Sequence, residues 1–189
     1  MIQIIGIIEV SIFYFAYFFK LFMQKKKGIS TNQLGKGTKS RKTIVIETML
    51  RISSMVIVFA TLISAICNTS IISIYYFRYL GLVLLGVGTC IFIIAMMTMR
   101  DSWRAGIPKE DKTKLVNTGI YKYSRNPAFV GFDLTYIGAS LAYSNIALVM
   151  ISIITIVLMH LQILEEEKFL ESAFGLEYVN YKSKVSRYF

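Results

Sequence analysis

The chain has 189 residues, of which 55% are hydrophobic and only 17% are charged, and its mean hydropathy is +0.58. A water-soluble domain of this length could not bury so much apolar surface, so the composition excludes an ordinary soluble protein. The formal net charge of +10 would suit a nucleic-acid partner, but the basic residues cluster between apolar runs, as juxtamembrane charges do. The composition therefore predicts an integral membrane protein that is surrounded by lipid and binds no nucleic acid.

A helix needs about 20 apolar residues to cross the ~30 Å hydrocarbon core of a bilayer. Five segments reach or approach that length: 2–23, 44–67, 79–99, 128–143 and 146–164. We therefore predict an all-α integral membrane protein with about five transmembrane helices and an amphipathic cytosolic segment at the C-terminal end. The fourth segment is the shortest, and its depth in the membrane stays open.

The first two segments carry few charges. No basic residue precedes the first segment and no small-x-small cleavage site precedes Lys25, which favours a membrane helix over a cleaved signal peptide. The second segment has Glu47 and Arg51 one helical turn apart near its start. This spacing predicts an ion pair at the level of the lipid headgroups, where it costs little.

The Lys and Arg counts of the connections predict the orientation. Along the chain they are seven in 24–42, one in 68–78, seven in 100–127, none between the last two segments and four after Leu164. This alternation places the N-terminus outside and the C-terminus in the cytosol. We expect two parts: residues 1–99, with three helices and a basic cytosolic loop at 24–42, and residues 100–189, with a cytosolic loop, a helical hairpin at 128–164 and a cytosolic tail.

The segment Arg125-Asn126-Pro127 precedes the fourth predicted helix. Proline disfavours helical geometry at the preceding residue and suits the first turn of a helix, so the early N–H groups of this helix can meet an anion. Gly131 and Gly138 share one face and permit the close approach of a second helix or of a flat ligand. The alternative is an ordinary juxtamembrane arginine with two packing glycines.

Three acidic residues, Glu165-Glu166-Glu167, follow the fifth apolar segment directly. Carboxylates at a helix C-terminus oppose the helix dipole. The helix is therefore expected to continue into the cytosol, with some of these carboxylates facing inward; the alternative is a solvated acidic end. Beyond them, apolar residues recur near helical spacing at Phe169, Leu170, Phe174, Tyr178, Tyr181 and Val185.

Several common sites are missing from the sequence. It has no GxxxxGK[ST] phosphate loop, and Gly86-Val87-Gly88 lies inside a predicted span, where it indicates helix packing. The single histidine, His160, has neither a second histidine nor a cysteine pair near it in the sequence, so no metal site is predicted.

Two runs in the second half together resemble the isoprenylcysteine carboxyl methyltransferase family, which is related to membrane phospholipid N-methyltransferases. The first run is Leu115-Val116-x-x-Gly119-Ile120-Tyr121-x-Tyr123-x-Arg125-Asn126-Pro127-x-Phe129-x-Gly131-x-x-Leu134-x-x-x-Gly138. The second run is Glu166-Glu167-x-x-Leu170-x-x-x-Phe174-Gly175-x-x-Tyr178-x-x-Tyr181. The family usually has Arg-His-Pro followed by x-Tyr, where this chain has Arg-Asn-Pro followed by Ala-Phe. These differences leave the methyl acceptor open.

The resemblance implies S-adenosylmethionine as cofactor, held between the last two spans and the tail. Arg125 and the exposed N–H groups would bind its carboxylate, Glu166 or Glu167 its ammonium, and aromatic residues its adenine. Asp133 would line the same cavity, the alternative being an interfacial position. The residues expected to bind the cofactor are Tyr121, Tyr123, Arg125, Asn126, Pro127, Phe129, Gly131, Asp133, Gly138, Glu166 and Glu167.

Methyl transfer is an in-line displacement, for which a protein mainly aligns the reactants and excludes water. The sequence singles out no catalytic residue. The implied acceptor is hydrophobic or membrane-resident and could arrive from the lipid. The alternative is a non-enzymatic membrane scaffold or transporter subunit that retains the methyltransferase fold. The oligomeric state stays open.

Overall fold

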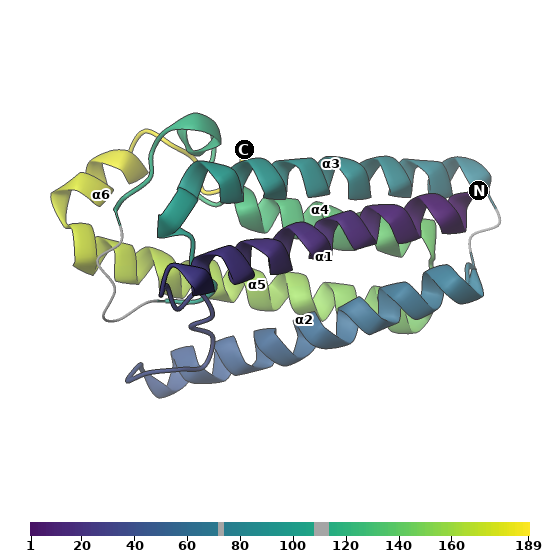
Figure 1. Cartoon of the computed structure of the whole chain (residues 1–189), viewed down its shortest axis with the longest axis horizontal. Coiled ribbons are helices and arrows are strands. Elements are labelled where there is room, and N and C mark those ends of the chain that lie inside the picture. Colours follow the sequence, from purple (N-terminus) through teal and green to yellow (C-terminus); the bar gives the residue numbers. More distant parts are fainter. Residues whose placement is uncertain (72–73, 108–113) are drawn as a thin grey trace.

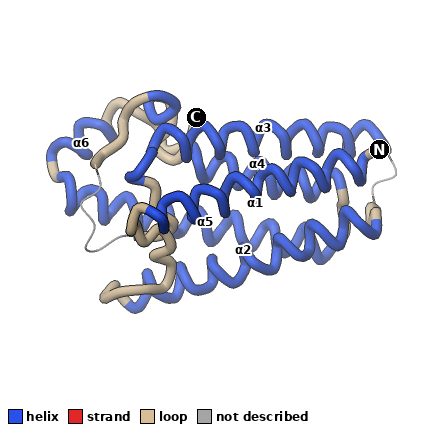
Figure 2. The backbone as a smooth tube through the Cα atoms, viewed as in Figure 1, coloured by secondary structure: helices blue, strands red, loops and turns tan. Residues whose placement is uncertain are grey.

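A computed structural model describes residues 1–71, 74–107 and 114–189, and this part of the chain contains helices and loops but no strand (Figure 2). The all-α prediction is confirmed. The elements are α1 (Ile2–Lys26), α2 (Arg41–Cys67), α3 (Tyr75–Met99), the 3-10 turns η1 (Arg100–Ser102) and η2 (Gly119–Lys122), α4 (Pro127–Ala142), α5 (Ile146–Phe174) and α6 (Leu176–Lys182).

The five long helices form one elongated bundle, with α6 and the longer loops gathered at the end opposite the N-terminus (Figure 1). Among the described residues, four helices are long and apolar enough to cross a membrane: α1, α2, α3 together with η1, and α5. Helix α4 has 16 residues, fewer than a full crossing needs. The chain is thus an integral membrane protein by its apolar helices, and the fifth crossing stays a prediction.

Helices α3 and α4 pack backbone against backbone because glycines face each other across their contact. A Cβ atom on Gly138 would lie 2.5 Å from the Gly81 carbonyl oxygen and 2.5 Å from the Leu85 nitrogen. One on Gly131 would lie 2.7 Å from the Phe92 nitrogen and 2.8 Å from the Gly88 oxygen. The shared glycine face therefore admits a helix, which is one of the two uses that its spacing predicts.

Glu47 ties two loops to the bundle and is fully buried. Its carboxylate accepts four hydrogen bonds: from Lys39 Nζ at 2.6 Å, Gly35 N at 2.8 Å, Ile107 N at 3.0 Å and Gln162 Nε2 at 3.3 Å. The expected pair with Arg51 is therefore wrong. The loop before α2, with Gly35 and Lys39, and the loop after η1, with Ile107, both fold over the N-terminal part of α2 and supply Glu47 with donors.

Helix α5 begins and ends as its sequence suggests. Asn145 caps its start by accepting a hydrogen bond from Leu148 N at 2.9 Å. The helix then runs through the three consecutive glutamates to Phe174, so it does not end at its acidic residues. Gly175, with a positive φ of 54°, turns the chain into α6. This extension brings the acidic residues to the loop end of the bundle.

Candidate functional site

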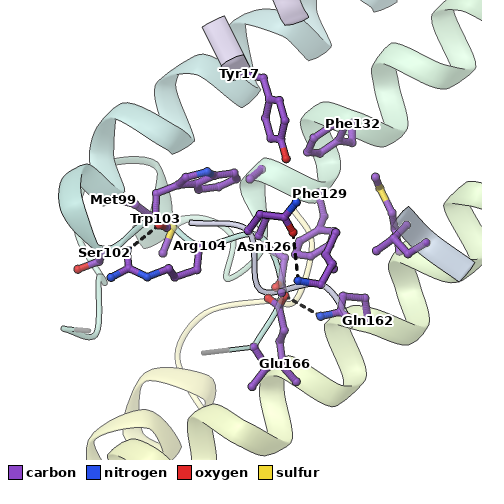
Figure 3. Close-up of a pocket in the computed structure, with 18 of the residues that line it drawn as sticks. Tyr17, Met99, Ser102, Trp103, Arg104, Asn126, Phe129, Phe132, Gln162 and Glu166 are labelled. Atoms are coloured by element: carbon purple, nitrogen blue, oxygen red, sulfur yellow. Dashed lines mark hydrogen bonds between the residues drawn. The ribbon is translucent and has the colours of Figure 1, made fainter. Parts of the chain in front are cut away.

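A cavity of about 450 Å³ lies at the loop end of the bundle, and this volume is typical of ligand pockets, which span about 300–1,000 Å³. Its walls come from residues of all six α-helices, of η1 and η2, and of the loops that follow α1 and η1 (Figure 3). The segments that build it are far apart in the sequence, and the glycine-packed α3–α4 pair holds one wall in place.

Five of the predicted cofactor-binding residues line this cavity: Tyr121, Arg125, Asn126, Phe129 and Glu166. The other six are not among its lining residues: Tyr123, Pro127, Gly131, Asp133, Gly138 and Glu167. Tyr123 is 70% exposed, and the two glycines face α3 instead. The structure therefore brings the centres of both sequence motifs together and leaves several of their flanking residues outside.

The neighbours Glu166 and Glu167 have different surroundings because adjacent side chains on a helix point about 100° apart. Glu166 faces the cavity, where its Oε1 accepts a hydrogen bond from Gln162 Nε2 at 3.0 Å (Figure 3). Glu167 lies on the other side and binds two guanidinium groups, with Arg125 Nη2 and Arg187 Nη2 each 2.9 Å from one of its oxygens. Only Glu166 can therefore meet a ligand in the cavity.

Arg125 uses most of its donors within the protein. Besides Glu167, which its Nε and Nη2 contact, its Nη1 donates to the carbonyls of Lys182 at 3.1 Å and Val185 at 2.5 Å. A guanidinium has five N–H donors, so only one remains for a ligand. The side chain therefore holds the C-terminal segment against the start of α4.

Asn126 and its neighbours bind the same C-terminal segment. The side-chain Nδ2 of Asn126 donates to the Arg187 carbonyl oxygen at 3.3 Å, and the backbone nitrogen of Arg125 donates to the Ser186 carbonyl oxygen at 2.9 Å. Pro127 occupies the first turn of α4, and Asn126 gives this helix no side-chain cap. The first N–H groups of α4 thus keep their capacity to bind an anion beside Ala128 and Phe129, which both line the cavity.

Gln162 and Trp103 are cavity residues that sequence reasoning missed. Gln162 Oε1 and Trp103 Nε1 are both buried, and neither has a hydrogen-bond partner in the part of the chain that the structure describes. Both residues line the cavity, so one unpaired acceptor and one unpaired donor lie buried in its wall. The spacing of Gln162, one turn before Glu166 on the same helix, could have revealed it. Trp103 follows α3 in an irregular loop, where no periodicity marks it.

Aromatic side chains fill the wall behind Trp103. Its ring meets Phe92 edge-on at 5.7 Å, and Phe92 contacts Phe132 of α4 at 4.7 Å. Nearby, the Tyr181 hydroxyl donates to the Tyr121 carbonyl at 2.6 Å. Burial raises the pKa of Tyr181 to about 12, so this hydroxyl keeps its proton at neutral pH. The wall is apolar, with its few hydrogen-bonding groups placed at its edge.

Asp133 lies on another side of α4, near Tyr188 of the C-terminal segment. Burial, with a smaller contribution from the Asp133 carboxylate, raises the pKa of Tyr188, whose hydroxyl is 2.6 Å from His160 Nδ1. One oxygen of Asp133 is buried and has no hydrogen-bond partner among the described residues. Its position beside the tail gives no support to the expected role in the cavity.

With this geometry in view, the phospholipid methyltransferase family matches residues 76–177, just over half of the chain. The chain belongs to this family. The match runs from the start of α3 into α6, and it contains the first motif and the second as far as residue 177, whereas α1 and α2 lie outside it.

Curated relatives agree with the resemblance read from the motifs. The chain is 36% identical over 109 residues to the protein-S-isoprenylcysteine O-methyltransferase of Saccharomyces cerevisiae, a match that covers 56% of this chain and 46% of that protein. It is 31% identical over 114 residues to a probable protein-S-isoprenylcysteine O-methyltransferase of Oryza sativa subsp. indica, covering 59% and 60%. The rat enzyme is 30% identical over 108 residues, covering 56% and 38%. The predicted resemblance is confirmed, and the match spans about half the length of these relatives.

Proposed function

We propose that the protein is an S-adenosylmethionine-dependent methyltransferase that acts on a hydrophobic or membrane-resident acceptor by direct in-line methyl transfer. One observation carries this proposal: Tyr121, Asn126 and Phe129 from one motif and Glu166 from the other line a single cavity of ligand size. The two motifs are separated by a helical hairpin, so their convergence does not follow from sequence order alone. Membership in a methyltransferase family supplies the reaction class.

The cavity residues fit the cofactor. Glu166 offers a carboxylate for its ammonium, next to Gln162, whose buried Oε1 has no partner among the described residues. The start of α4 offers N–H groups for its carboxylate, in place of the Arg125 side chain, which is mostly committed to the protein. Tyr121 and Phe129 offer apolar faces for adenine. When bound, the cofactor supplies an electrophilic methyl group on a sulfonium.

The protein's own contribution is alignment and the exclusion of water. The aromatic wall of Trp103, Phe92 and Phe132 keeps one side of the cavity dry, and the Glu47 network closes two loops over its end. Holding two reactants in line supplies a large part of the acceleration of such a displacement. A strong base is unnecessary if the acceptor is already an anion.

We also propose that the cavity opens toward the cytosol, with the N-terminus outside. The basic loop 24–42 and Arg104 lie at the cavity end, and the α4–α5 turn lies at the other. Single cysteines placed at Lys36 and Asn145 test this. The first should react only with reagents that reach the cytosol and the second only from outside. Lys112, in the predicted cytosolic loop 100–127, would be a third labelling position and lies outside the described residues.

The alternative is a non-enzymatic scaffold. Arg125 and Asn126, at the centre of the first motif, bind the protein's own tail, which favours a structural role for these two residues. A scaffold has no reason to bind S-adenosylmethionine or to transfer its methyl group.

Methyl transfer from labelled cofactor tests the proposal. The purified protein in lipid is incubated with methyl-labelled S-adenosylmethionine and a membrane extract, and the labelled product is identified. We expect a labelled amphiphile with the parent and loss of labelling with Glu166→Gln. A folded parent that labels nothing in extracts from several sources would favour the scaffold.

A further inference from the structure

The cavity extends between α1 and α2, beyond the segment that matches the methyltransferase family. Besides Leu50, the lining of this extension includes four residues of each helix: Tyr14, Tyr17, Phe18 and Leu21 of α1, and Arg51, Ser54, Met55 and Val58 of α2. Each set follows the spacing i, i+3, i+4, i+7, which places its members on one helix face. The two faces form what we call the α1–α2 slot. Its walls are mostly apolar, and it lies between two candidate membrane spans.

Arg51 is the one charged residue among these eight. It is exposed to the cavity and has no hydrogen-bond or ion-pair partner in residues 1–71, 74–107 and 114–189. Glu47, one turn earlier on the same helix, cannot neutralise it because the Glu47 carboxylate is committed to Lys39 and the two loops. An unpaired charge inside a membrane span is costly and faces a cavity or a functional partner.

The other charged residues around the cavity add to the positive potential of Arg51. Arg51, Arg104, Lys114 and Arg125 line it, against the single carboxylate of Glu166 among the described residues. Arg125 is neutralised by Glu167, and Glu166 already binds Gln162. Arg51 stands apart from this polar end, at the slot side of the cavity. The slot therefore combines an apolar trough with an unmatched planar cation.

Depth decides which kind of molecule this arrangement fits. Arg51 is ten residues after the start of α2 at Arg41, or about 15 Å along the helix axis. Ser54, Met55 and Val58 continue the slot beyond Arg51, away from the loop end. A ligand would thus place an anionic group near the loops and a hydrocarbon chain farther along, parallel to lipid chains. This is the polarity of an anionic amphiphile.

We propose that Arg51 is a specificity-determining residue that binds the anionic group of an amphiphilic acceptor, whose hydrocarbon chain lies in the α1–α2 slot. The proposal rests on the proposed methyltransferase function and assigns the acceptor site to α1 and α2, outside the family match. An arginine fork can bind two oxygens of a carboxylate or a phosphodiester, so one such group would satisfy it. The acceptor would enter from the lipid between the two helices.

Binding of fluorescent amphiphiles tests the proposal without knowledge of the natural acceptor. The probes share one labelled twelve-carbon chain and carry a carboxylate, a phosphodiester, a neutral amide or a quaternary ammonium as headgroup. They are titrated into the parent, Arg51→Gln, Arg51→Lys and the control Arg41→Gln, which changes an exposed arginine of the same helix outside the cavity. The two anionic arms show which kind of anion is preferred.

We expect the parent to bind at least one anionic probe roughly tenfold or more tightly than the amide, as a charge-assisted contact predicts. Arg51→Gln should erase this preference while its affinity for the amide stays unchanged, and Arg51→Lys should keep part of it, which covers the case that the glutamine variant fails to fold. Arg41→Gln should behave as the parent. An undiminished preference in both Arg51 variants, or a parent that prefers the ammonium or the amide, would overturn the proposal.

Cofactor affinity, measured on the same samples, separates this proposal from the proposed function. Arg51→Gln should bind S-adenosylhomocysteine as tightly as the parent. Loss of that binding would assign Arg51 to the cofactor and overturn its role toward the acceptor. A parent that binds no cofactor but retains the anionic preference would refute the methyltransferase function and leave an amphiphile site.

Discussion

Helices α3 and α4 pack together in a way that α1 and α2 do not. In the first pair, glycines bring the backbones so close that a Cβ on Gly81 would lie 2.5 Å from the Ala142 nitrogen. In the second pair, Tyr17 and Phe18 of α1 and Met55 of α2 all line the cavity. Small residues let α3 and α4 pack closely, whereas large residues keep α1 and α2 farther apart. The closed pair fixes the start of α4, and the open pair leaves room for a ligand.

Helix α1 has one closely packed face and one face that lines the slot, and two substitutions can distinguish them. Phe13 is fully buried against Phe92 and Phe132, with ring centroids 4.6 and 5.1 Å away, whereas Phe18 on the slot face is 60% exposed. Phe13→Ala should cost about 3 kcal/mol, the lower end of the range for such changes, because packing rather than water exclusion dominates in lipid. Phe18→Ala should cost under about 1 kcal/mol. Thermal unfolding in detergent measures both; equal losses would mean that the slot is a packed interface.

The close α3–α4 contact predicts a strong dependence on single methyl groups. In Gly81→Ala the new Cβ would meet backbone atoms of α4, which cannot move singly, so we expect a loss of about 1–3 kcal/mol. Gly86→Ala, on the same helix, meets only the Glu9 carboxylate at 3.0 Å, the end of a flexible side chain. This control should be neutral or stabilising, because alanine favours helix over glycine by up to about 1 kcal/mol. Equal melting temperatures for the two variants would contradict the close contact.

Glu166 and Glu167 separate cofactor binding from tail anchoring. Glu166→Gln should weaken binding of S-adenosylhomocysteine by roughly tenfold or more while the melting temperature stays near that of the parent. Glu167→Gln should instead lower the melting temperature, because it leaves the mostly buried Arg125 and its neighbour Arg187 without their shared carboxylate. Its effect on affinity should be the smaller of the two. The reverse assignment, with Glu167 controlling affinity directly, would place the ligand on the other side of α5.

Asp133→Asn should have the smallest effect of these changes. The carboxylate lies by Tyr188 and is not among the residues that line the cavity, so cofactor affinity should stay within about threefold of the parent. The stability should change little, because the buried oxygen of Asp133 has no hydrogen bond to lose among the described residues. A stable variant with much weaker cofactor binding would restore Asp133 to the site, as its place in an apolar segment first suggested.

Local patterns in the sequence predict the helices, the closed pair and the core of the site. Apolar length predicts the spans, the seven-residue spacing of Gly131 and Gly138 predicts a close approach, and helical geometry predicts that Glu166 and Glu167 diverge. The partners of Glu47 could not be predicted, because Lys39 and Ile107 reach it only when two loops fold back over α2. The use of Arg125 to hold the C-terminal segment depends in the same way on the tail's return to α4.

Calorimetric titration of S-adenosylhomocysteine into the purified protein in lipid nanodiscs tests the cavity's role most directly. The cavity predicts micromolar affinity, on the order of −8 kcal/mol, for the parent. Glu166→Gln should bind at least about tenfold more weakly, and Arg41→Gln should match the parent. A folded parent that releases no heat and gains no thermal stability with the ligand would contradict the assignment of this cavity to the cofactor.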